Sequence, residues 1–407
     1  MKKHAVELTP RDLLFLRDAR PMEASDAGLG ANWPRPDQIY HALLSAFYLR
    51  WPTRQPWEGE GHRGREERRD MAFRFGALKT VGPFPRKDGK LFFPRPLDLG
   101  MKLVECTGTD LPPPLKYAFL PAAKGKASLP QWVSADTMGK YLDGQSVFKL
   151  EEKDSDLFGS DRNIGIAIDQ ATGTTVEHML YQAEYLRLKD GVTLACEASC
   201  EMMLNRENRL LDAYDPAETG SERIEQIVLG GQQGMCSVEI DKYDFSLPKR
   251  SKDQSPTRFV RWTLLTPAVF NAGWKPGWIS PEGRVMLPRA DAAVERVSGE
   301  SRDGWRRRKN ATTGFGATLV AARLDKPVPF SGWKLDVAQS GNFGACPKPT
   351  VLAVPAGSCY VFECETEDEA RILAATLESA PRSDLLGSQG FGVGACSYIP
   401  DPKKITD

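Results

Sequence analysis

The sequence predicts an α+β protein made of two tandem ferredoxin-like, RRM-like domains, with a long insertion in the first. Three observations carry this prediction. Segments with strand and helix patterns follow one another as β-α-β-β-α-β, or as part of that order, in each half of the chain. A cluster of glycines precedes the last strand of each half, in LGGQQG (Leu229–Gly234) and in SQGFGVGAC (Ser388–Cys396). A polar stretch, LPKRSKDQSPT (Leu247–Thr257), separates the halves and is typical of a linker.

The first domain is predicted over residues 1–246 and begins with a strand and a helix. Val6 and Leu8 alternate with polar residues, as in a strand, and Asp37 after two prolines marks a helix start. The helix carries an apolar stripe at helical spacing that packs on a sheet, formed by Ile39, Leu43, Ala46 and Phe47. From about 52 to 160 prolines and glycines are frequent and strands are short, which indicates an insertion rather than an independent domain.

Regular patterns return at residue 161. The segment 161–188 predicts a hairpin that turns at Ala171–Thr174, and the apolar run after Asp190–Gly191 predicts the next strand. A helix is predicted over Glu201–Tyr214. The first glycine cluster and a strand over Cys236–Ile240 then complete the domain.

The second domain is predicted over residues 257–407. Its first strand lies in Arg258–Phe270, and a loop-rich region follows. The clearest helix of the chain begins at Thr366, which forms a T-x-x-E capping box with Glu369. The second glycine cluster and a strand over Ala395–Ile399 follow that helix, whereas no convincing first helix is visible in this half.

Composition narrows the classes of function. Lysine plus arginine and aspartate plus glutamate number 54 each, so a surface that binds nucleic acid must be local. No run of about 18 apolar residues exists, and the first residues lack the apolar core of a signal peptide, so we expect no membrane span and a cytoplasmic protein. The eight cysteines form no CxxC pair, and no Walker loop is present; we therefore expect neither a metal nor a cofactor.

Several motifs together resemble a known family. LFLRDARP (Leu14–Pro21) and WPRPDQIYHALLSA (Trp33–Ala46) resemble the opening of subunit three of the Cmr complex, a RAMP protein of the Cas-five-like group in type III-B CRISPR effectors. The resemblance continues in order through DRNIGIAIDQATGT (Asp161–Thr174), LYQAEYLRL (Leu180–Leu188), LGGQQG, LLTPAVF (Leu264–Phe270), SGWK (Ser331–Lys334), VPAGS (Val354–Ser358) and GFGVG (Gly390–Gly394). Each motif is weak alone, and their order makes the match strong. Ala19 stands where a glycine is common, and the basic segment 50–74 does not align.

The resemblance implies two ferredoxin-like RAMP domains and a role in antiviral RNA-guided interference. It implies binding of the repeat-derived 5′ handle of the guide RNA, docking to the large polymerase-like subunit, and contact with neighbouring backbone RAMP subunits. It implies no nuclease activity for this subunit. The alternatives are an RNA-processing endoribonuclease of the RAMP type that uses His41, and a pure protein–protein scaffold.

Basic residues near the start are the first candidates for RNA contact. Arg17 and Arg20 flank an acid after the first strand and can clamp phosphates, or form an internal loop network. Arg35, Gln38 and His41 lie at the start of the first helix, where the helix terminus attracts phosphate. His41 can act as a general base for RNA cleavage, but no second histidine or paired acid lies near it in sequence, so a structural or RNA-stacking role is favoured.

The predicted hairpin and a basic cluster are further candidates. Arg162 and Asn163 begin the hairpin, which in the resembled family projects as a thumb that shapes the guide; an ordinary hairpin with a solvated tip is the alternative. Arg306 and Arg307 belong to a basic cluster, Arg302–Lys309, around Trp305. That cluster can contact RNA, face solvent, or meet an acidic partner surface.

The two glycine loops are the last candidates. Gly230, Gly231 and Gln232 form the first loop, for which contact of backbone amides with phosphate is favoured. Gly390, Phe391 and Gly392 form the second loop, where amides can bind phosphate and Phe391 can stack on a base. The alternative is tight packing of the loops, with Phe391 in the core, and such a role is favoured for at least part of the second loop.

Overall fold

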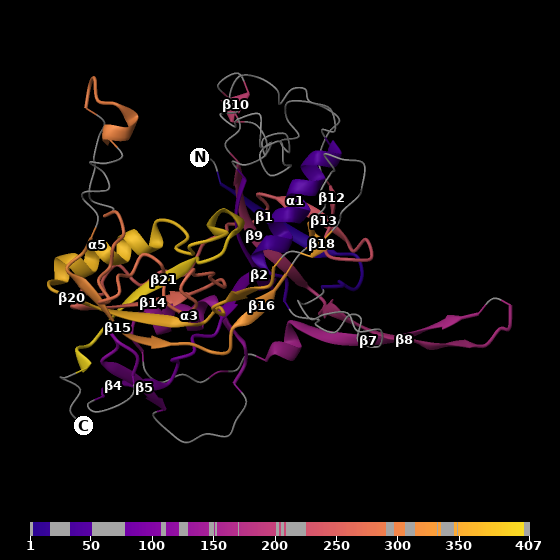
Figure 1. Ribbon diagram of the computed structural model, residues 1–407, viewed down its shortest axis with the longest axis horizontal. Coiled ribbons are helices and arrows are strands. Elements are labelled where there is room, and N and C mark those ends of the chain that lie inside the picture. Colours follow the sequence, from indigo (N-terminus) through magenta and orange to yellow (C-terminus); the bar gives the residue numbers. More distant parts are fainter. Residues whose placement is uncertain are drawn as a thin grey trace.

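The fold is a mixed α/β arrangement dominated by strands in several sheets, seen in a computed structural model (Figure 1). The structure describes residues 3–16, 33–50, 78–106, 111–121, 129–145, 150, 153–169, 171–200, 203–204, 207–208, 225–289, 297–305, 314–331, 333–334, 346–347 and 349–402. Within these residues no helix is both long enough and apolar enough to cross a membrane.

A seven-stranded antiparallel sheet forms the first half. Its strand order is β12(Gln226–Val228)-β13(Met235–Ile240)-β1(His4–Pro10)-β9(Val192–Cys200)-β2(Leu78–Lys87)-β3(Lys90–Pro94)-β6(Trp132–Ser134). Helix α1(Pro36–Arg50) buries Ile39, Leu43 and Ala46 against Val6 and Leu8 of β1, as the predicted stripe requires. The side chain of Phe47, the fourth residue of that stripe, lies outside the described residues.

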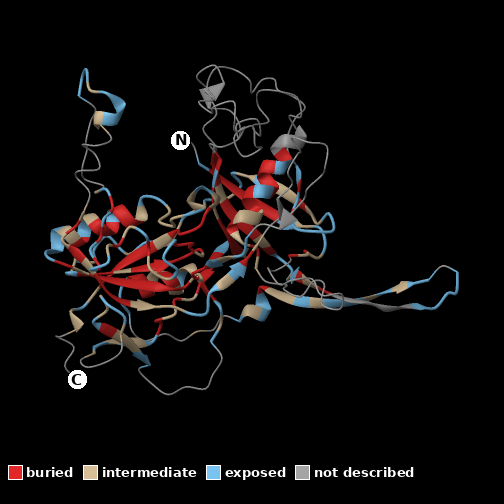
Figure 2. Ribbon diagram, in the orientation of Figure 1, coloured by how far each residue is buried: buried red, intermediate tan, exposed pale blue. Residues whose placement is uncertain are grey.

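A four-stranded antiparallel sheet forms the second half, in the order β15(Ala317–Arg323)-β20(Cys359–Cys364)-β14(Phe259–Leu264)-β21(Gly394–Ile399). Helix α5(Glu367–Glu378) covers one face. The Thr366 half of its predicted capping box is confirmed, because the Thr366 hydroxyl accepts a hydrogen bond from the Glu369 amide at 3.1 Å. The Glu369 carboxylate turns to Arg289 and to the Gly316 amide. The sheet core, red in Figure 2, is fully buried around Trp262 and Tyr360.

The predicted hairpin is confirmed. β7(Phe158–Ile168) pairs with β8(Thr175–Leu188) over their length, and Figure 1 shows this two-stranded ribbon projecting far from both sheets. The predicted helix over Glu201–Tyr214 is wrong where the structure describes it, because β10(Met203–Leu204) pairs with β11(Glu207–Asn208); there strand pairing overrides local helix propensity.

The predicted insertion over 52–160 contains strands of the main sheet. β2 pairs with β9 and β3, but the ladder is interrupted between Val81 and Phe84, where Gly82 and Pro83 stand. β2 contains two prolines and a glycine, which are uncommon inside strands, so its sequence does not show the alternating pattern that predicts a strand. The remaining elements of the chain are β4(Met101–Glu105), β5(Tyr117–Pro121), α3(Ala135–Leu142), η1(Asp154–Asp156), β16(Val328–Phe330), β17(Trp333–Lys334), β18(Cys346–Pro347), β19(Val351–Ala353) and η3(Gly387–Gln389).

The later part of the insertion packs on the second half. The β4–β5 hairpin lies against the sheet face away from α5, where Tyr117 contacts Phe259 edge-on. Met138 and Leu142 of α3 share a core with Leu265 and Val393 of the second half. The two sheets are therefore joined by a common hydrophobic interior.

A buried cluster of charged and polar side chains stabilises the contact between the two halves. The guanidinium of Arg261 on β14 donates to Asp98 at 3.0 Å, to the Tyr141 carbonyl at 2.9 Å and to Ser397 Oγ at 3.0 Å. Tyr141 donates its hydroxyl to Asp98 at 2.6 Å, and its ring lies 3.7 Å below the guanidinium. The side chains of Asp98 and Arg261 are 2% and 11% exposed, so the pair is hidden from water. Burial raises the pKa of the Tyr141 hydroxyl well above its usual value.

The predicted linker is packed onto the protein surface. Arg250 pairs with Glu378 at 3.0 Å, and Gln254 donates to the carbonyls of Leu142 and Tyr398 at 3.1 and 3.2 Å. These contacts reach α3 on one side and the second half on the other. The stretch between β13 and β14 thus follows a fixed path across the junction.

Candidate nucleic-acid interface

The base of the β7–β8 ribbon divides into two faces. Because side chains alternate along a strand, Ser160, Arg162, Ile164 and Ile166 share one side, which we call the front face. Arg162 is 68% exposed and lies 3.5 Å from Glu184 on the neighbouring strand. Ile164 and Ile166 are 66% and 49% exposed. The front face therefore combines a cation with apolar side chains that face solvent, and Figure 2 shows the ribbon mostly exposed.

The opposite side, which we call the back face, carries Asp161, Asn163, Tyr185 and Arg187. Arg187 is held by an ion pair with Asp161. Asn163 is exposed, but strand alternation directs it away from Arg162. The two predicted hairpin residues thus lie on opposite faces, and the structure does not bring them together.

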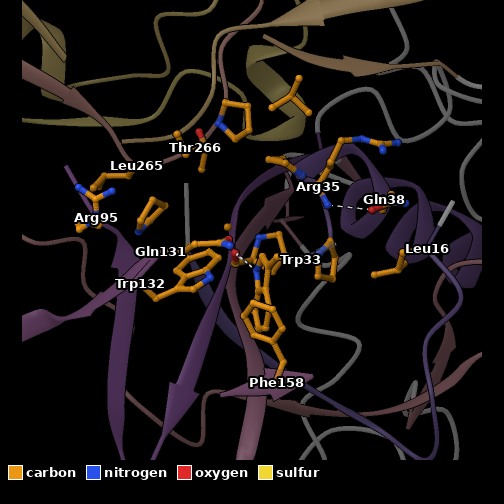
Figure 3. Close-up of a pocket in the computed structure, with 18 of the residues that line it drawn as sticks. Leu16, Trp33, Arg35, Gln38, Arg95, Gln131, Trp132, Phe158, Leu265 and Thr266 are labelled. Carbon is orange, nitrogen blue, oxygen red and sulfur yellow. Dashed lines mark hydrogen bonds between the residues drawn. The ribbon is translucent and has the colours of Figure 1, made fainter. Parts of the chain in front are cut away.

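A cavity of about 820 Å³ opens where the ribbon meets both halves (Figure 3); we call it the junction cavity. Phe158 and Ser160 of β7 line it beside the start of α1 and the end of β3, together with the loop around Thr266 and Pro329 of β16 in the second half. The front face of the ribbon therefore runs directly into this cavity. Two predicted residues, Arg35 and Gln38, also line it.

Both of these predicted residues are engaged in internal contacts. The Gln38 side chain accepts a hydrogen bond from the Arg35 amide at 2.8 Å and so caps α1. The Arg35 guanidinium forms a two-pronged pair with Asp37 at 3.1 and 3.3 Å and lies 5.2 Å from the centre of the Phe330 ring. Arg35 therefore shapes the wall of the cavity, and its charge is already compensated.

Three aromatic side chains that were not predicted as site residues form another wall. Trp33 packs edge-on against Trp132 at 5.2 Å and contacts the tilted ring of Phe158 at 5.5 Å, both measured between ring centres. The Trp33 indole donates to the Pro83 carbonyl at 2.9 Å, beside the interruption in the β2 ladder. The irregularity of β2 thus holds Trp33 in place.

Arg95, also missed, lies at the end of β3 on the cavity wall. Its Nε donates to the Pro130 carbonyl at 2.8 Å, and its Nη1 donates to the Pro96 carbonyl at 3.2 Å. Burial lowers the pKa of Arg95 from its usual value, although the nearby Asp154 opposes this. The sequence FFPRP places this arginine between two prolines after an apolar strand. Because prolines restrict the backbone, this pattern could have indicated a rigidly held cation.

His41 lies on the exposed side of α1, next to Tyr40, whose ring is 5.4 Å away and nearly perpendicular to the imidazole. It is not among the residues that line the junction cavity. Within the described chain no three histidine, cysteine, aspartate or glutamate side chains gather as a metal site.

The first glycine loop is fastened to the base of the ribbon. The Gly231 amide donates to the Phe15 carbonyl at 2.9 Å, and a Cβ at Gly230 would lie 2.5 Å from that same oxygen. Tyr185 on the back face donates to Gln232 Oε1 at 2.6 Å and packs on Phe15. The Gly231 amide is therefore used within the protein, which corrects the expectation that this amide faces phosphate; Gly230, Gly231 and Gln232 themselves remain exposed.

The second glycine loop lies in the interior, so Gly390, Phe391 and Gly392 are corrected from RNA contacts to packing residues. Phe391 is fully buried and stacks on Phe330 at 5.3 Å, where no base can reach it. A Cβ at Gly390 would lie 2.8 Å from the Thr80 carbonyl of the first half. Through Phe330 the loop supports Arg35 at the cavity wall. The alternative of tight packing fits this loop.

Four predicted residues, Arg17, Arg20, Arg306 and Arg307, lie outside the described residues, and so does most of the basic segment 50–74. The structure describes Leu14 and Phe15 just before Arg17. Leu14 pairs with Leu186 of β8 through two backbone hydrogen bonds of 2.9 and 2.8 Å. Leu14 and Phe15 therefore lie at the base of the ribbon.

Comparison with known proteins gives one family. A family model described as "CRISPR-associated protein (Cas_Cmr3)" matches residues 6–399. No curated protein matches the chain.

Chains in solved structures of CRISPR complexes match this chain over most of its length. A chain of the type III-B Cmr-beta complex bound to cognate target RNA and AMPPnP is 16% identical, with a TM-score of 0.41, over 88% of this chain and 86% of that one. A chain of the Csm3–Csm4 subcomplex of a type III-A interference complex is 10% identical, with a TM-score of 0.34, over 88% and 92%. A chain of the Csm1–Csm4 cassette in complex with cA4 is 11% identical, with a TM-score of 0.35, over 87% and 98%.

Proposed function

This chain belongs to the Cas_Cmr3 family of CRISPR-associated proteins and is a type III CRISPR effector subunit, and on that premise we propose that it binds the repeat-derived 5′ handle of the guide RNA without cleaving RNA. One observation carries the proposal: the front face of the ribbon leads into the junction cavity. Single-stranded RNA is bound through cations that meet its phosphates and aromatic side chains that stack on its bases. Arg162 and the cavity aromatics supply both chemistries in one continuous path.

The two halves are, in this proposal, ferredoxin-like RAMP domains over 1–246 and 257–407. The strand order supports this: β13-β1-β9-β2 in the first half and β21-β14-β20-β15 in the second have the same succession when strands are numbered along the chain. α1 follows the first strand of one set, and α5 precedes the last strand of the other. Within the described residues, each half thus shows a different helix of the β-α-β-β-α-β order.

The proposed partners are those of an effector subunit: the large polymerase-like subunit and neighbouring backbone RAMP subunits. We place the protein in the cytoplasm. The six cysteines whose side chains the structure describes are all free thiols, and Cys196, Cys359 and Cys396 are fully buried, which suits a reducing compartment.

Incubation of the purified chain with labelled repeat RNA separates the candidate functions. Binding without cleavage supports the proposal. Cleavage supports the endoribonuclease, and neither binding nor cleavage supports a scaffold.

We expect replacement of Arg162 by Gln to weaken binding of single-stranded RNA about fivefold, since one exposed charge contact is worth about 1 kcal/mol. The slope of log affinity against log salt should flatten by about 0.7 for the lost phosphate contact. Arg187→Gln on the back face is the matched control, since Arg187 is also exposed and also pairs across the ribbon. A larger effect of Arg187→Gln, in fluorescence anisotropy over a salt series, would place the RNA on the wrong face for this proposal.

We expect His41→Ala to leave guide maturation and RNA integrity unchanged, because His41 is not among the residues that line the junction cavity and a cleavage site needs a base beside the reacting phosphate. Denaturing gels of guide RNA incubated with the wild type and with the variant measure this. Cleavage by the wild type that the variant lacks, with RNA binding retained, refutes the non-catalytic assignment and favours the endoribonuclease.

A further inference from the structure

The β7–β8 ribbon projects so far that its direction depends on the contacts at its base. Ile168 lies seven residues beyond Asp161 on β7, which at about 3.4 Å per residue is roughly 24 Å of strand. Figure 1 shows this length leaving both sheets. A small rotation at the base therefore becomes a large displacement of the front face.

A short extended segment joins the base of the ribbon to the first glycine loop. On one side, Leu14 exchanges two backbone hydrogen bonds of 2.9 and 2.8 Å with Leu186 of β8. On the other side, the carbonyl of Phe15 accepts a hydrogen bond from the Gly231 amide at 2.9 Å. Leu14 and Leu186 are buried, so their pairing is protected from water.

One side-chain hydrogen bond connects the same ribbon base and glycine loop at the surface. The Tyr185 hydroxyl donates to Gln232 Oε1 at 2.6 Å, and the Tyr185 ring packs on Phe15 with 5.4 Å between ring centres. We call the hydrogen bond between Tyr185 and Gln232 the ribbon latch. Because the latch is exposed, water can replace it, and its loss leaves the buried pairing of Leu14 with Leu186 in place.

The first glycine loop has an uncommon conformation at the latch. Gln232 and Gln233 have φ +53° and +55°, a left-handed conformation that residues other than glycine rarely adopt. A hydrogen bond of 2.8 Å from the Leu229 amide to the Gly234 carbonyl closes the loop around them. Uncommon backbone conformations gather at functional sites, and this one places the Gln232 amide oxygen against the Tyr185 hydroxyl.

We propose that Tyr185 and Gln232 are positioning residues for the guide RNA, and that the latch holds the ribbon in the direction in which its front face binds RNA. This rests on the RNA binding proposed above and names a contact that regulates it from the back face. Tyr185 acts without touching the RNA, because strand alternation places it opposite Arg162. When the latch opens, the ribbon turns about the pairing of Leu14 with Leu186 and RNA affinity falls.

Two single replacements and their combination test the latch through RNA affinity. Tyr185→Phe removes the hydroxyl and keeps the ring, whereas Gln232→Leu removes the acceptor. In fluorescence anisotropy with the full chain and a synthetic RNA that carries the 5′ handle, each should weaken binding about 2- to 10-fold, the worth of one hydrogen bond. The double variant should bind no more weakly than either single variant, and additive losses overturn the proposal.

Tyr243→Phe is the matched control. It removes a hydroxyl that donates to the carbonyls of Val6 and Cys196 within the first sheet, at 3.2 and 3.3 Å. This variant should bind the handle RNA as tightly as the wild type. A loss equal to that of Tyr185→Phe would show that any missing tyrosine hydroxyl lowers affinity, which overturns the proposal.

Gln232→Glu separates positioning from direct contact with phosphate. A carboxylate still accepts the Tyr185 hydroxyl, so this variant should bind RNA near the wild-type level. If Gln232 instead met a phosphate, the added negative charge would make Gln232→Glu weaker than Gln232→Leu. That order of affinities overturns the proposal.

A distance measurement tests the direction of the ribbon without RNA. Spin labels on unnatural amino acids at Ala171, in the ribbon turn, and at Glu239, on β13, are both exposed and report the tip-to-sheet distance by double electron–electron resonance. Tyr185→Phe should broaden or shift the distance distribution, and Gln232→Glu should leave it unchanged. An unchanged distribution in Tyr185→Phe, or unchanged RNA affinity beside tight wild-type binding, overturns the latch proposal alone. Failure of the wild type to bind any handle RNA overturns both proposals.

Discussion

Replacement of Asp98 by Ala is expected to destabilise the protein by about 3–5 kcal/mol, because it leaves the Arg261 guanidinium buried without its carboxylate. Burial alone lowers the pKa of Arg261, but attraction from Tyr141 and Asp98 outweighs it, and the net pKa lies above the usual value. An arginine side chain keeps its proton at any ordinary pH, so the cation stays charged when Asp98 is lost. Urea unfolding monitored by tryptophan fluorescence, with nine tryptophans in the chain, measures the change.

Two comparisons isolate the cause. Glu365→Ala removes an exposed pair with Arg284, 3.7 Å long and 70% and 62% exposed, and should cost less than about 1 kcal/mol. The double replacement Asp98→Leu with Arg261→Met removes both charges and should recover much of the loss, since apolar residues of similar volume often replace a buried pair without penalty. Equal small effects of Asp98→Ala and Glu365→Ala would show that water reaches the cluster.

Gly392→Ala is expected to lower stability by more than about 3 kcal/mol for two reasons. The new Cβ would clash with the main chain of Ser383, and alanine would have to adopt a left-handed conformation that it disfavours. Gly392 has φ +78°, and a Cβ there would lie 2.2 Å from the Ser383 nitrogen. Ser383 cannot move aside freely, because its hydroxyl exchanges hydrogen bonds with the amide and carbonyl of Val269. Thermal unfolding of the purified variant measures the loss.

Gly89 provides the control for backbone strain alone. It has φ +79° in the β2–β3 turn, and a Cβ there would meet nothing within 4 Å. Gly89→Ala should cost about 1–2 kcal/mol, the price of the left-handed conformation. A Gly392→Ala protein as stable as wild type, with reduced RNA affinity, would falsify the packing role and restore the second glycine loop as an RNA contact.

Local signals predicted the elements that depend on local sequence. Four such signals span only a few residues each, and the elements that they predict are confirmed. They are the alternation around Val6, the stripe from Ile39 to Ala46, the hairpin turn at 171–174 and the cap at Thr366. β2 was missed because its pairing with β9 tolerates Gly82 and Pro83 through an interruption that only the partner strand defines. The helix predicted over residues 203–208 is wrong for a related reason. The pairing of β10 with β11 depends on contacts between two strands, and the helix propensity of a single segment does not include such contacts.

The candidate site was predicted in part, for similar reasons. Arg162 and the start of α1 were found because a hairpin and a helix terminus have local signatures. Arg95, Trp132 and Phe158 come from three separate segments, and only the tertiary fold brings them to one cavity. For Phe391 the sequence left two readings open, stacking on a base or packing in the core. The structure places it in a core cluster with Val269, Phe330 and Ala353 of its own half. These partners come from separate segments of the chain, so the loop sequence alone does not distinguish the two readings.

The burial of the second glycine loop bears on how this protein can vary over evolution. The two glycine clusters occupy equivalent places before the last strand of each sheet, yet the first stays at the surface and the second meets the main chain of β2. Gly390 approaches the carbonyl of Thr80, so its constraint comes from the path of another strand and not from a side chain. Point substitutions in β2 can therefore accumulate without disturbing the loop. An insertion or deletion that shifts the register of β2 cannot, and lineages that change the length of this strand must also rebuild the loop 310 residues later in the chain.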